Sequence, residues 1–298
     1  MAKTKNKEKH KVIDKKIESP WQVAWRQFKK NKLGMMGLFI LIIIALVAIF
    51  APQLAPNSPY STNILQANQA PGGDFPLGTD RVGRCIMSRM LYGARVSIAV
   101  GLISMSISVF IGTTLGLMAG YFGGLVDTLI SRLIDIVRSV PFLILAIVIA
   151  SIWGPGLYRL MAIIGILSWT GVARLVRGEV LALREREFIH ASRASGADDS
   201  RIMFKHLLPN TFAPIIVNAT LAVAAAILSE AGLSYLGLGI QPPMPSWGNM
   251  LNEARNLVIL ESRPWFWMPP GFMIIITVLS INFMGDGLRD ALDPKLTR

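Results

Sequence analysis

The chain has 298 residues, of which 52% are hydrophobic and 16% charged, whereas a soluble domain of this length would carry more charge and interleave it. Eleven of its 30 basic residues precede residue 34, and this segregation of a net charge of +12 favours the cytoplasmic segments of a membrane protein over nucleic-acid binding. The single cysteine, Cys85, excludes an intrachain disulfide and a cysteine-based metal site.

Six segments are near the length and apolarity that a helix needs to cross a membrane. They cover residues 33–51, 96–120, 133–152, 157–176, 211–231 and 268–285. The first follows a long basic segment, which indicates a retained anchor rather than a signal peptide. The sequence therefore predicts an all-α, multi-pass membrane protein with six transmembrane helices.

The distribution of basic residues predicts the orientation of these helices. With the N-terminus inside, the outer segments 52–95, 153–159 and 232–267 hold only seven of the 30 Lys and Arg residues. This asymmetry satisfies the positive-inside rule and places both termini in the cytoplasm. We expect the following parts: a cytoplasmic N-terminal segment 1–32, a first transmembrane helix 33–52, an extracytoplasmic cap 53–92, a five-helix core 93–287 with a cytoplasmic loop 177–210, and a cytoplasmic tail 288–298.

Three features in the second span and the outer segments predict local structure. Gly112, Gly116 and Gly120 recur every four residues, which indicates a tight helix–helix seam, or only the glycine enrichment usual in membrane helices. The cap should contain a short surface helix reaching Ala94. Three tryptophans of the last outer segment are expected in an interfacial belt; they are Trp247, Trp265 and Trp267.

Charged residues near the membrane have two interpretations each. Asp135 and Arg138 are three apart and are expected to pair on one helix face; they serve transport or form a structural salt bridge at the inner boundary. Glu230 ends the fifth span near the outer face. It lines the solute pathway or a gate, or it lies in the wet interface.

The longest inner loop, residues 177–210, has the composition of two helices rather than of a connector. A helix-forming stretch from Glu179 to Ser195 stops at Gly196, a typical residue after a helix C-terminus. Asp198 and Asp199 then suit the positive end of a second helix that runs toward Pro209. A cytoplasmic projection of this shape suits docking into a groove on a partner.

This loop resembles the cytoplasmic signature of ABC importer permeases: Glu-Ala-Ala, three residues, Gly, nine residues, Ile-x-Leu-Pro. Aligned on Gly196, the residues Ala191, Leu208 and Pro209 match the signature. The departures from it are His190, Ser192 and His206. Residues 76–97, 119–141 and 230–251 resemble the dipeptide and oligopeptide branch, specifically the second permease of the pair, although Cys85 stands where that family usually has Asp.

The resemblance, which covers roughly residues 20–290, implies a type I ABC importer permease in a bacterial inner membrane. Its partners would be a homologous permease in a heterodimer, two cytoplasmic ATPases and an extracytoplasmic solute-binding protein. The chain itself would be non-catalytic and without cofactors, because the ATPases bind ATP and Mg²⁺. The substrates implied are dipeptides or oligopeptides, with nickel-chelate or opine solutes as the alternative.

The same resemblance identifies the residues expected to couple the chain to an ATPase. They are Phe188, Ile189, His190, Ala191, Ser192, Ala194, Ser195, Gly196, Ala197, Leu208 and Pro209. Helical spacing places Phe188, Ile189 and Ser192 on one face, and the small residues Ala191, Ala194 and Ser195 would allow close approach. Gly196 is expected to take a positive φ at the reversal.

Other functional motifs are missing from the sequence. No Gly-x4-Gly-Lys-Ser/Thr loop is present, so the chain is not the ATPase, and no metal or catalytic site is expected. The three histidines, His10, His190 and His206, favour structural or surface roles. Two rivals from other classes are an ion-coupled secondary transporter, which would show discontinuous spans and internal repeats, and a membrane scaffold, which would not need the docking loop.

Overall fold

The computed structural model describes residues 19–292, which form helices joined by loops. His10, most of the segment 1–32 and the end of the tail 288–298 lie outside these residues. Within the described range, five helical segments are long and apolar enough to cross a membrane. They are α3 (Lys32–Ile49), α5 (Ile86–Phe122), α8 (Leu157–Arg184), the segment Asp199–Tyr235, and α14 (Met268–Leu292).

The segment Asp199–Tyr235 is helical throughout but consists of three parts. These are α10 (Asp199–Arg201), the π-helical stretch η2 (Ile202–Leu207) and α11 (Leu208–Tyr235). The shorter elements of the fold are α2 (Pro20–Phe28), α4 (Ala51–Leu54), η1 (Ile64–Gln66), α9 (Glu187–Ala194), α12 (Trp247–Glu253), α13 (Leu257–Ser262) and η3 (Pro264–Phe266).

The third predicted span, 133–152, is not one straight helix. The chain forms α6 (Gly124–Ser139) and α7 (Phe142–Trp153), which meet at an angle of 85°. Pro141 explains the break, because proline disfavours helical geometry at the preceding residue, and Val140 is extended with φ −107° and ψ 133°. Counted as one bent span, the pair raises the number of spans in the described chain to six.

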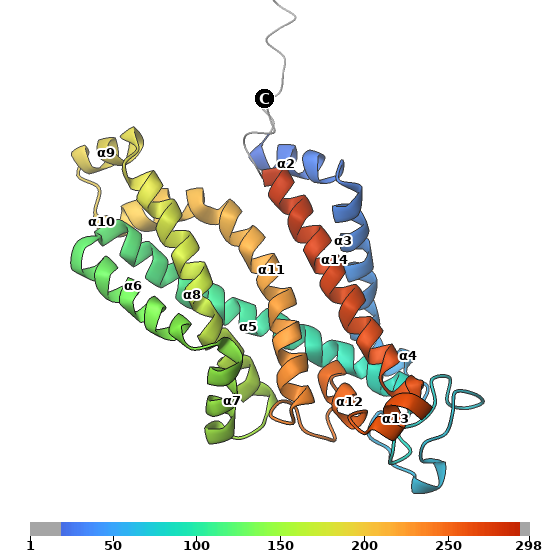
Figure 1. Ribbon diagram of the computed structural model, residues 1–298. Helices are drawn as coiled ribbons and strands as arrows, with labels where there is room; N and C mark the ends of the chain where they lie inside the picture. The colour runs from blue at the N-terminus through green and yellow to red at the C-terminus, as the bar shows by residue number, and fades with distance from the viewer. Residues whose placement is uncertain (1–18, 293–298) are drawn as a thin grey trace, which may run out of the picture.

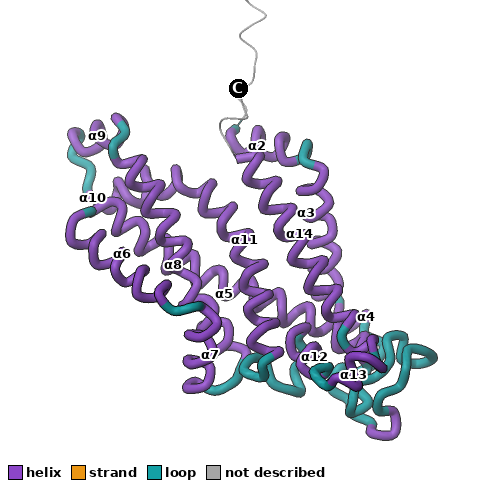
Figure 2. The backbone as a smooth tube through the Cα atoms, viewed as in Figure 1, coloured by secondary structure: helices purple, strands orange, loops and turns teal. Residues whose placement is uncertain are grey.

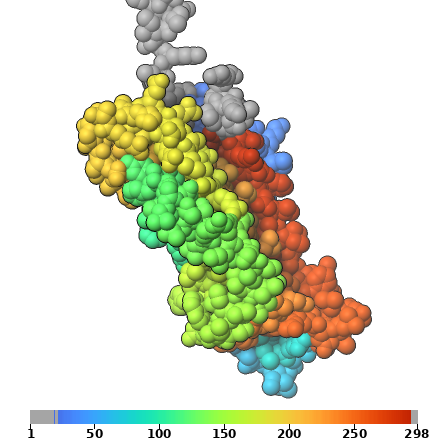
Figure 3. Space-filling model, turned by 60° about the vertical axis from the view of Figure 1, so that its left-hand side comes forward, coloured from blue at the N-terminus to red at the C-terminus, as the bar shows by residue number. Residues whose placement is uncertain are grey.

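The helices arrange the loops at two opposite ends of the molecule. Figure 1 places α9 at the same end as α2 and the end of α14, while α12, α13 and the segment after α4 lie at the other end. Figure 2 shows most of the loop structure gathered at that second end. In the space-filling view, the green band of α6 and α7 runs from the yellow α9 end toward the cyan cap end (Figure 3).

The glycine seam predicted in the second span is confirmed, and its partner is α8. A Cβ atom built on Gly112 would lie 2.6 Å from Val172 Cβ, and one on Gly120 would lie 2.7 Å from Val180 Cβ. At Gly116 the nearest atom would be the carbonyl oxygen of Ala173 at 2.7 Å. Only glycine allows the two backbones to approach this closely.

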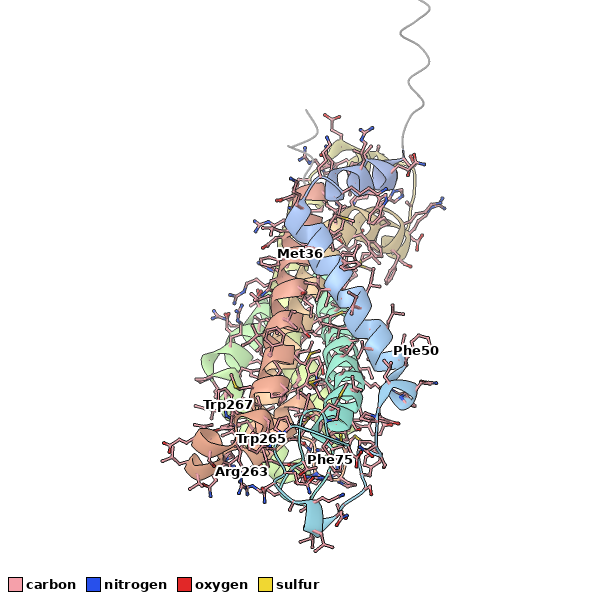
Figure 4. The ribbon with its side chains drawn as sticks, turned by 90° about the vertical axis from the view of Figure 1, so that its right-hand side faces the viewer. Met36, Phe50, Phe75, Arg263, Trp265 and Trp267 are labelled. Carbon is pink, nitrogen blue, oxygen red and sulfur yellow. The ribbon has the colours of Figure 1, made fainter. Side chains whose placement is uncertain are left out.

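A second close contact joins the first span to the last. A Cβ atom on Gly37 of α3 would lie 2.4 Å from the carbonyl oxygen of Ser280 in α14. One on Gly34 would lie 3.1 Å from Gly287 Cα. Figure 4 shows α3 running beside α14, with α2 lying across their end.

The cap differs from the prediction at its boundary with the core. α5 begins at Ile86 and continues to Phe122, so the stretch reaching Ala94 is not a separate surface helix, and the expected boundary at 92/93 falls inside α5. Ile86 and Ala94 are buried, so this stretch packs into the molecule and does not lie on a membrane surface.

The aromatic belt is also partly wrong. Trp247 is fully buried, and its indole Nε1 donates to the carbonyl of Met90 at 3.1 Å. Trp265 and Trp267 are half-buried beside the cap (Figure 4), where Arg263 donates to Asn68 at 2.5 Å. Trp247 therefore joins α12 to α5, and Trp265 packs beside Gly78 of the cap.

Candidate functional site

The loop predicted to dock forms a separate short helix at one end of the molecule. The helix-forming stretch from Glu179 to Ser195 is divided between two helices, because α8 ends at Arg184 and α9 begins at Glu187. Arg186 between them is extended, with φ −81° and ψ 145°. The change of direction turns α9 away from the axis of α8 (Figure 1).

The reversal after α9 has the predicted geometry. Gly196 has a φ of +78°, and the amide of Ala197 donates to the carbonyl of Ser192 at 3.1 Å, which satisfies the open end of the helix. No atom lies within 4 Å of a Cβ built on Gly196. Glycine is therefore favoured here by the backbone conformation and not by lack of space. Asp198 caps the next helix, because its side chain accepts from the amide of Arg201.

The face of α9 available to a partner differs from the prediction. Ile189, expected on the docking face, is fully buried, in a cluster with Val180, Ile202 and Leu207. Phe188 is 42% exposed and Ser192 is half-buried, so these three residues do not form one free face. Ile189 instead packs α9 against the rest of the protein. This contact stabilises α9, since an eight-residue helix is too short to be stable alone.

The opposite side of α9 is open. Its exposed residues are His190, Ala191, Ala194 and Ser195, followed by Gly196. Three of these five are alanine or serine and a fourth is glycine, so no long side chain on this surface stands between its backbone and an approaching partner. The remaining predicted residues lie at the base of the loop: Ala197 and Leu208 are half-buried, and Pro209 is exposed in the first turn of α11.

Tyr121, at the end of α5, holds both halves of the loop. Its hydroxyl donates to the carboxylate of Asp199 at 2.5 Å, and the guanidinium of Arg193 lies over its ring, 5.2 Å from the centroid. The sequence interpretation missed this role of Tyr121 and Arg193. An aromatic residue at the inner end of a span was the only signal, and it also suits an interfacial anchor.

Ion pairs connect α8 to the neighbouring helix α6. Arg177 donates through its Nε and Nη2 atoms to the two carboxylate oxygens of Asp127 in α6. Arg184 also donates to the backbone carbonyl of Gly120 in α5 at 3.1 Å. The predicted pair of Asp135 and Arg138 is wrong. Asp135 instead accepts from Arg174 of α8 at 3.2 Å, in an ion pair whose two side chains are exposed.

A buried polar network lies near the opposite end of the molecule, around Glu230. The Glu230 side chain is fully buried, and its carboxylate accepts hydrogen bonds from Ser97 at 3.2 Å and from Ser234 and Ser246 at 2.8 Å. The interpretation of Glu230 as a residue of the wet interface is wrong. In this conformation the carboxylate joins α5, α11 and the start of α12.

The network continues into the cap through two arginines. Arg89 and Arg84 both donate to Glu253 at 2.8 Å, and Arg84 also donates to Asp80 at 2.5 Å. Burial raises the pKa of the Glu253 carboxyl above its ordinary value, while attraction by Arg89 and Arg84 acts in the opposite direction. These contacts tie the cap to α12 and to the outer half of α5.

Among the described residues, no group of three or more His, Cys, Asp or Glu side chains is arranged to hold a metal ion. The loop offers a small, exposed helix face, and the network offers a rigid attachment between cap and helices.

Comparison with known proteins identifies two family models along the chain. Residues 112–298 match the model described as the binding-protein-dependent transport system inner membrane component. Residues 19–71 match the model described as the N-terminal TM domain of oligopeptide transport permease C.

Curated relatives match over nearly the whole chain. A dipeptide transport system permease protein of Alkalihalophilus pseudofirmus is 49% identical, over 93% of this chain and 91% of the relative. An oligopeptide transport system permease protein of Bacillus subtilis is 42% identical, over 96% and 93%. A glutathione transport system permease protein of Pectobacterium atrosepticum is 41% identical, over 96% and 94%.

Among solved structures, the fold is similar to a chain of the MetNI methionine ABC transporter in an inward-facing conformation. The TM-score is 0.54 at 22% identity, and the match covers 70% of this chain and 98% of the other. At this identity the similarity concerns the fold alone.

Proposed function

Because this chain belongs to the family of binding-protein-dependent transport system inner membrane components, we propose that it forms half of a translocation pathway for dipeptides or oligopeptides. The chain is a multi-pass inner-membrane permease of an ABC importer, and hydrolysis of ATP in this family is carried out by a separate subunit. Peptide import is supported by relatives named for dipeptides and oligopeptides. Nickel-chelate or opine solutes remain the alternative substrate class.

The proposed assembly contains a homologous permease, two cytoplasmic ATPases and an extracytoplasmic solute-binding protein. Residues 1–32, the loop 177–210 and the tail 288–298 face the cytoplasm, and the cap 53–92 faces outward. The core 93–287 crosses the membrane. The charge asymmetry of the sequence supports this orientation, and so does the position of α9 at the same end as α2 and the end of α14 (Figure 1).

One observation carries the coupling role: α9 is fixed firmly to its own chain on one side and open on the other. Ile189 is fully buried, and Tyr121 contacts both Arg193 and Asp199. A push on the exposed face at Ala191 and Ala194 is therefore transmitted to α5, α8 and α11. In this proposal, closure of the ATPase pair moves α9, and the helices follow.

We propose that Glu230 supports a gate at the outer end of the pathway. Its three serine donors come from α5, α11 and the residue before α12, so the carboxylate holds these elements together at the outer end. It acts by positioning helices and not by touching solute in this conformation.

The substrate is tested on the intact importer. The complex is purified from cells supplied with a mixture of peptides, and solutes retained by its binding subunit are identified by mass spectrometry. Retention of peptides of two or more residues, followed by their ATP-dependent uptake into vesicles, is the expected result. Retention of a metal chelate or an opine in their place would assign the alternative substrate class.

A further inference from the structure

The cationic end of the molecule around α2 has no role in the transport function proposed above. Residues 1–32 contain eleven basic and three acidic residues, a net charge of +8 out of +12 for the whole chain. Of these, Arg26, Lys29, Lys30 and Lys32 lie in the described range and are exposed. Such a cluster beside a transmembrane helix attracts an anionic membrane surface.

The helix α2 has the geometry of an interfacial helix. It lies across the end of α3 and α14 (Figures 1 and 4), and Phe28 on its inner side is 2% exposed, packed against Gly34 and Gly287. Trp25 stays 48% exposed, stacked on Phe28 and covered by the ammonium of Lys29 at 5.2 Å. An exposed tryptophan beside a lysine is typical of the headgroup level of a bilayer.

Apolar surface continues directly from the lysines. The first two turns of α3 expose Leu33, Met36 and Phe39 by 55%, 45% and 64%, starting one residue after Lys32. An apolar cavity of about 400 Å³ also lies between α3, α5, α11 and α14. A smaller one of about 110 Å³ lies under α2, lined by Trp25, Phe28 and Leu288 among others.

We propose that α2 and the start of α3 bind anionic phospholipid, with the headgroup at Lys29, Lys30 and Lys32 and an acyl chain along Leu33, Met36 and Phe39. The charge complementarity selects an anionic headgroup over a zwitterionic one, and the adjoining apolar face selects a lipid over a free anion. Asp290 accepts from Asn31 at 3.0 Å, so one carboxylate lies beside the three lysines and reduces the positive charge of the cluster without cancelling it.

The test measures lipid selectivity on the full chain reconstituted in phosphatidylcholine vesicles. Spin-labelled phosphatidylglycerol is expected to associate about threefold more strongly than spin-labelled phosphatidylcholine. Replacing Lys29, Lys30 and Lys32 together with glutamine should remove at least half of that preference, while arginine at the same positions should keep it. The matched control is glutamine at Arg186, Arg201 and Lys205, three exposed basic residues near α9, which should change little.

A second measurement locates the lipid. A bimane label on Leu33→Cys, with Cys85→Ser, should be quenched more strongly by brominated phosphatidylglycerol than by brominated phosphatidylcholine. A label on Phe110→Cys, which is 75% exposed on α5, should not distinguish them. Equal quenching at Leu33, unchanged selectivity in the glutamine variant, or full competition by inorganic phosphate would overturn the proposal. None of these readouts depends on transport.

Discussion

At the scale of single residues, the function of the loop depends on how the chain reverses after α9. Gly196 makes this turn with a φ of +78° in open space. A residue with a Cβ atom would meet no neighbour, but it would have to adopt a left-handed conformation that costs about 1–2 kcal/mol for most residues. Asparagine tolerates this region and β-branched residues resist it.

We therefore expect Gly196→Val to weaken transport and Gly196→Asn to retain most of it. Valine favours another backbone conformation and moves α9 relative to Ile202, while six spans stay inserted. The measurements are membrane abundance, co-purification of the ATPase subunits and ATP-dependent uptake. Wild-type uptake by the valine variant with its ATPases fully bound would show that α9 is not the coupling element.

Glu230 permits a second comparison at this scale. Glu230→Leu removes the acceptor of three buried hydroxyls, each of which costs about 1–3 kcal/mol if left unpaired, so a lower thermal unfolding midpoint of the purified chain is expected. Glu230→Gln keeps one acceptor and should lose less. A leucine variant as stable as the wild type but defective in uptake would instead place Glu230 on the solute path.

At the scale of elements, the seam between α5 and α8 is a close helix–helix contact that could be predicted from the sequence. The spacing of Gly112, Gly116 and Gly120 indicated it, because glycines four apart share a helix face. Length and apolarity likewise predicted five of the six spans. The bend at Pro141 was missed because a hydropathy window joins the apolar end of α6 to α7 and does not register one extended residue.

The seam should respond to a single methyl group. Gly116→Ala places a Cβ atom 2.7 Å from the carbonyl oxygen of Ala173, and overpacking of this kind costs about 1–3 kcal/mol. Gly171→Ala in α8 meets nothing within 4 Å and should be neutral or slightly stabilising. Thermal unfolding of both variants in the same detergent checks this, and equal midpoints would contradict the close packing.

Residue-level details of the loop were harder to predict than its existence. The signature around Gly196 predicted the turn, and Asp198 predicted the next helix start. The spacing of Phe188, Ile189 and Ser192 predicted that they share one face of a helix. It did not predict whether that face packs against the rest of the protein or stays exposed. That depends on Ile202, Leu207 and Tyr121, which approach only in the folded molecule.

At the scale of the whole molecule, the two ends of the helical bundle should lie on opposite sides of the membrane. Single cysteines at Leu65, which is 94% exposed, and at Ser200, which is exposed, are introduced with Cys85→Ser. An impermeant thiol reagent applied to intact cells should label position 65 and not position 200. The reverse pattern would invert the proposed orientation.

We expect this chain to move solute only when ATPase subunits drive it. The direct measurement compares two sets of vesicles: one contains the complete importer, and the other contains this chain alone. We predict ATP hydrolysis and peptide uptake by the complete importer, and neither activity by the chain alone, with or without an ion gradient. Solute uptake by the chain alone, driven by an ion gradient, would contradict the account and identify a secondary transporter.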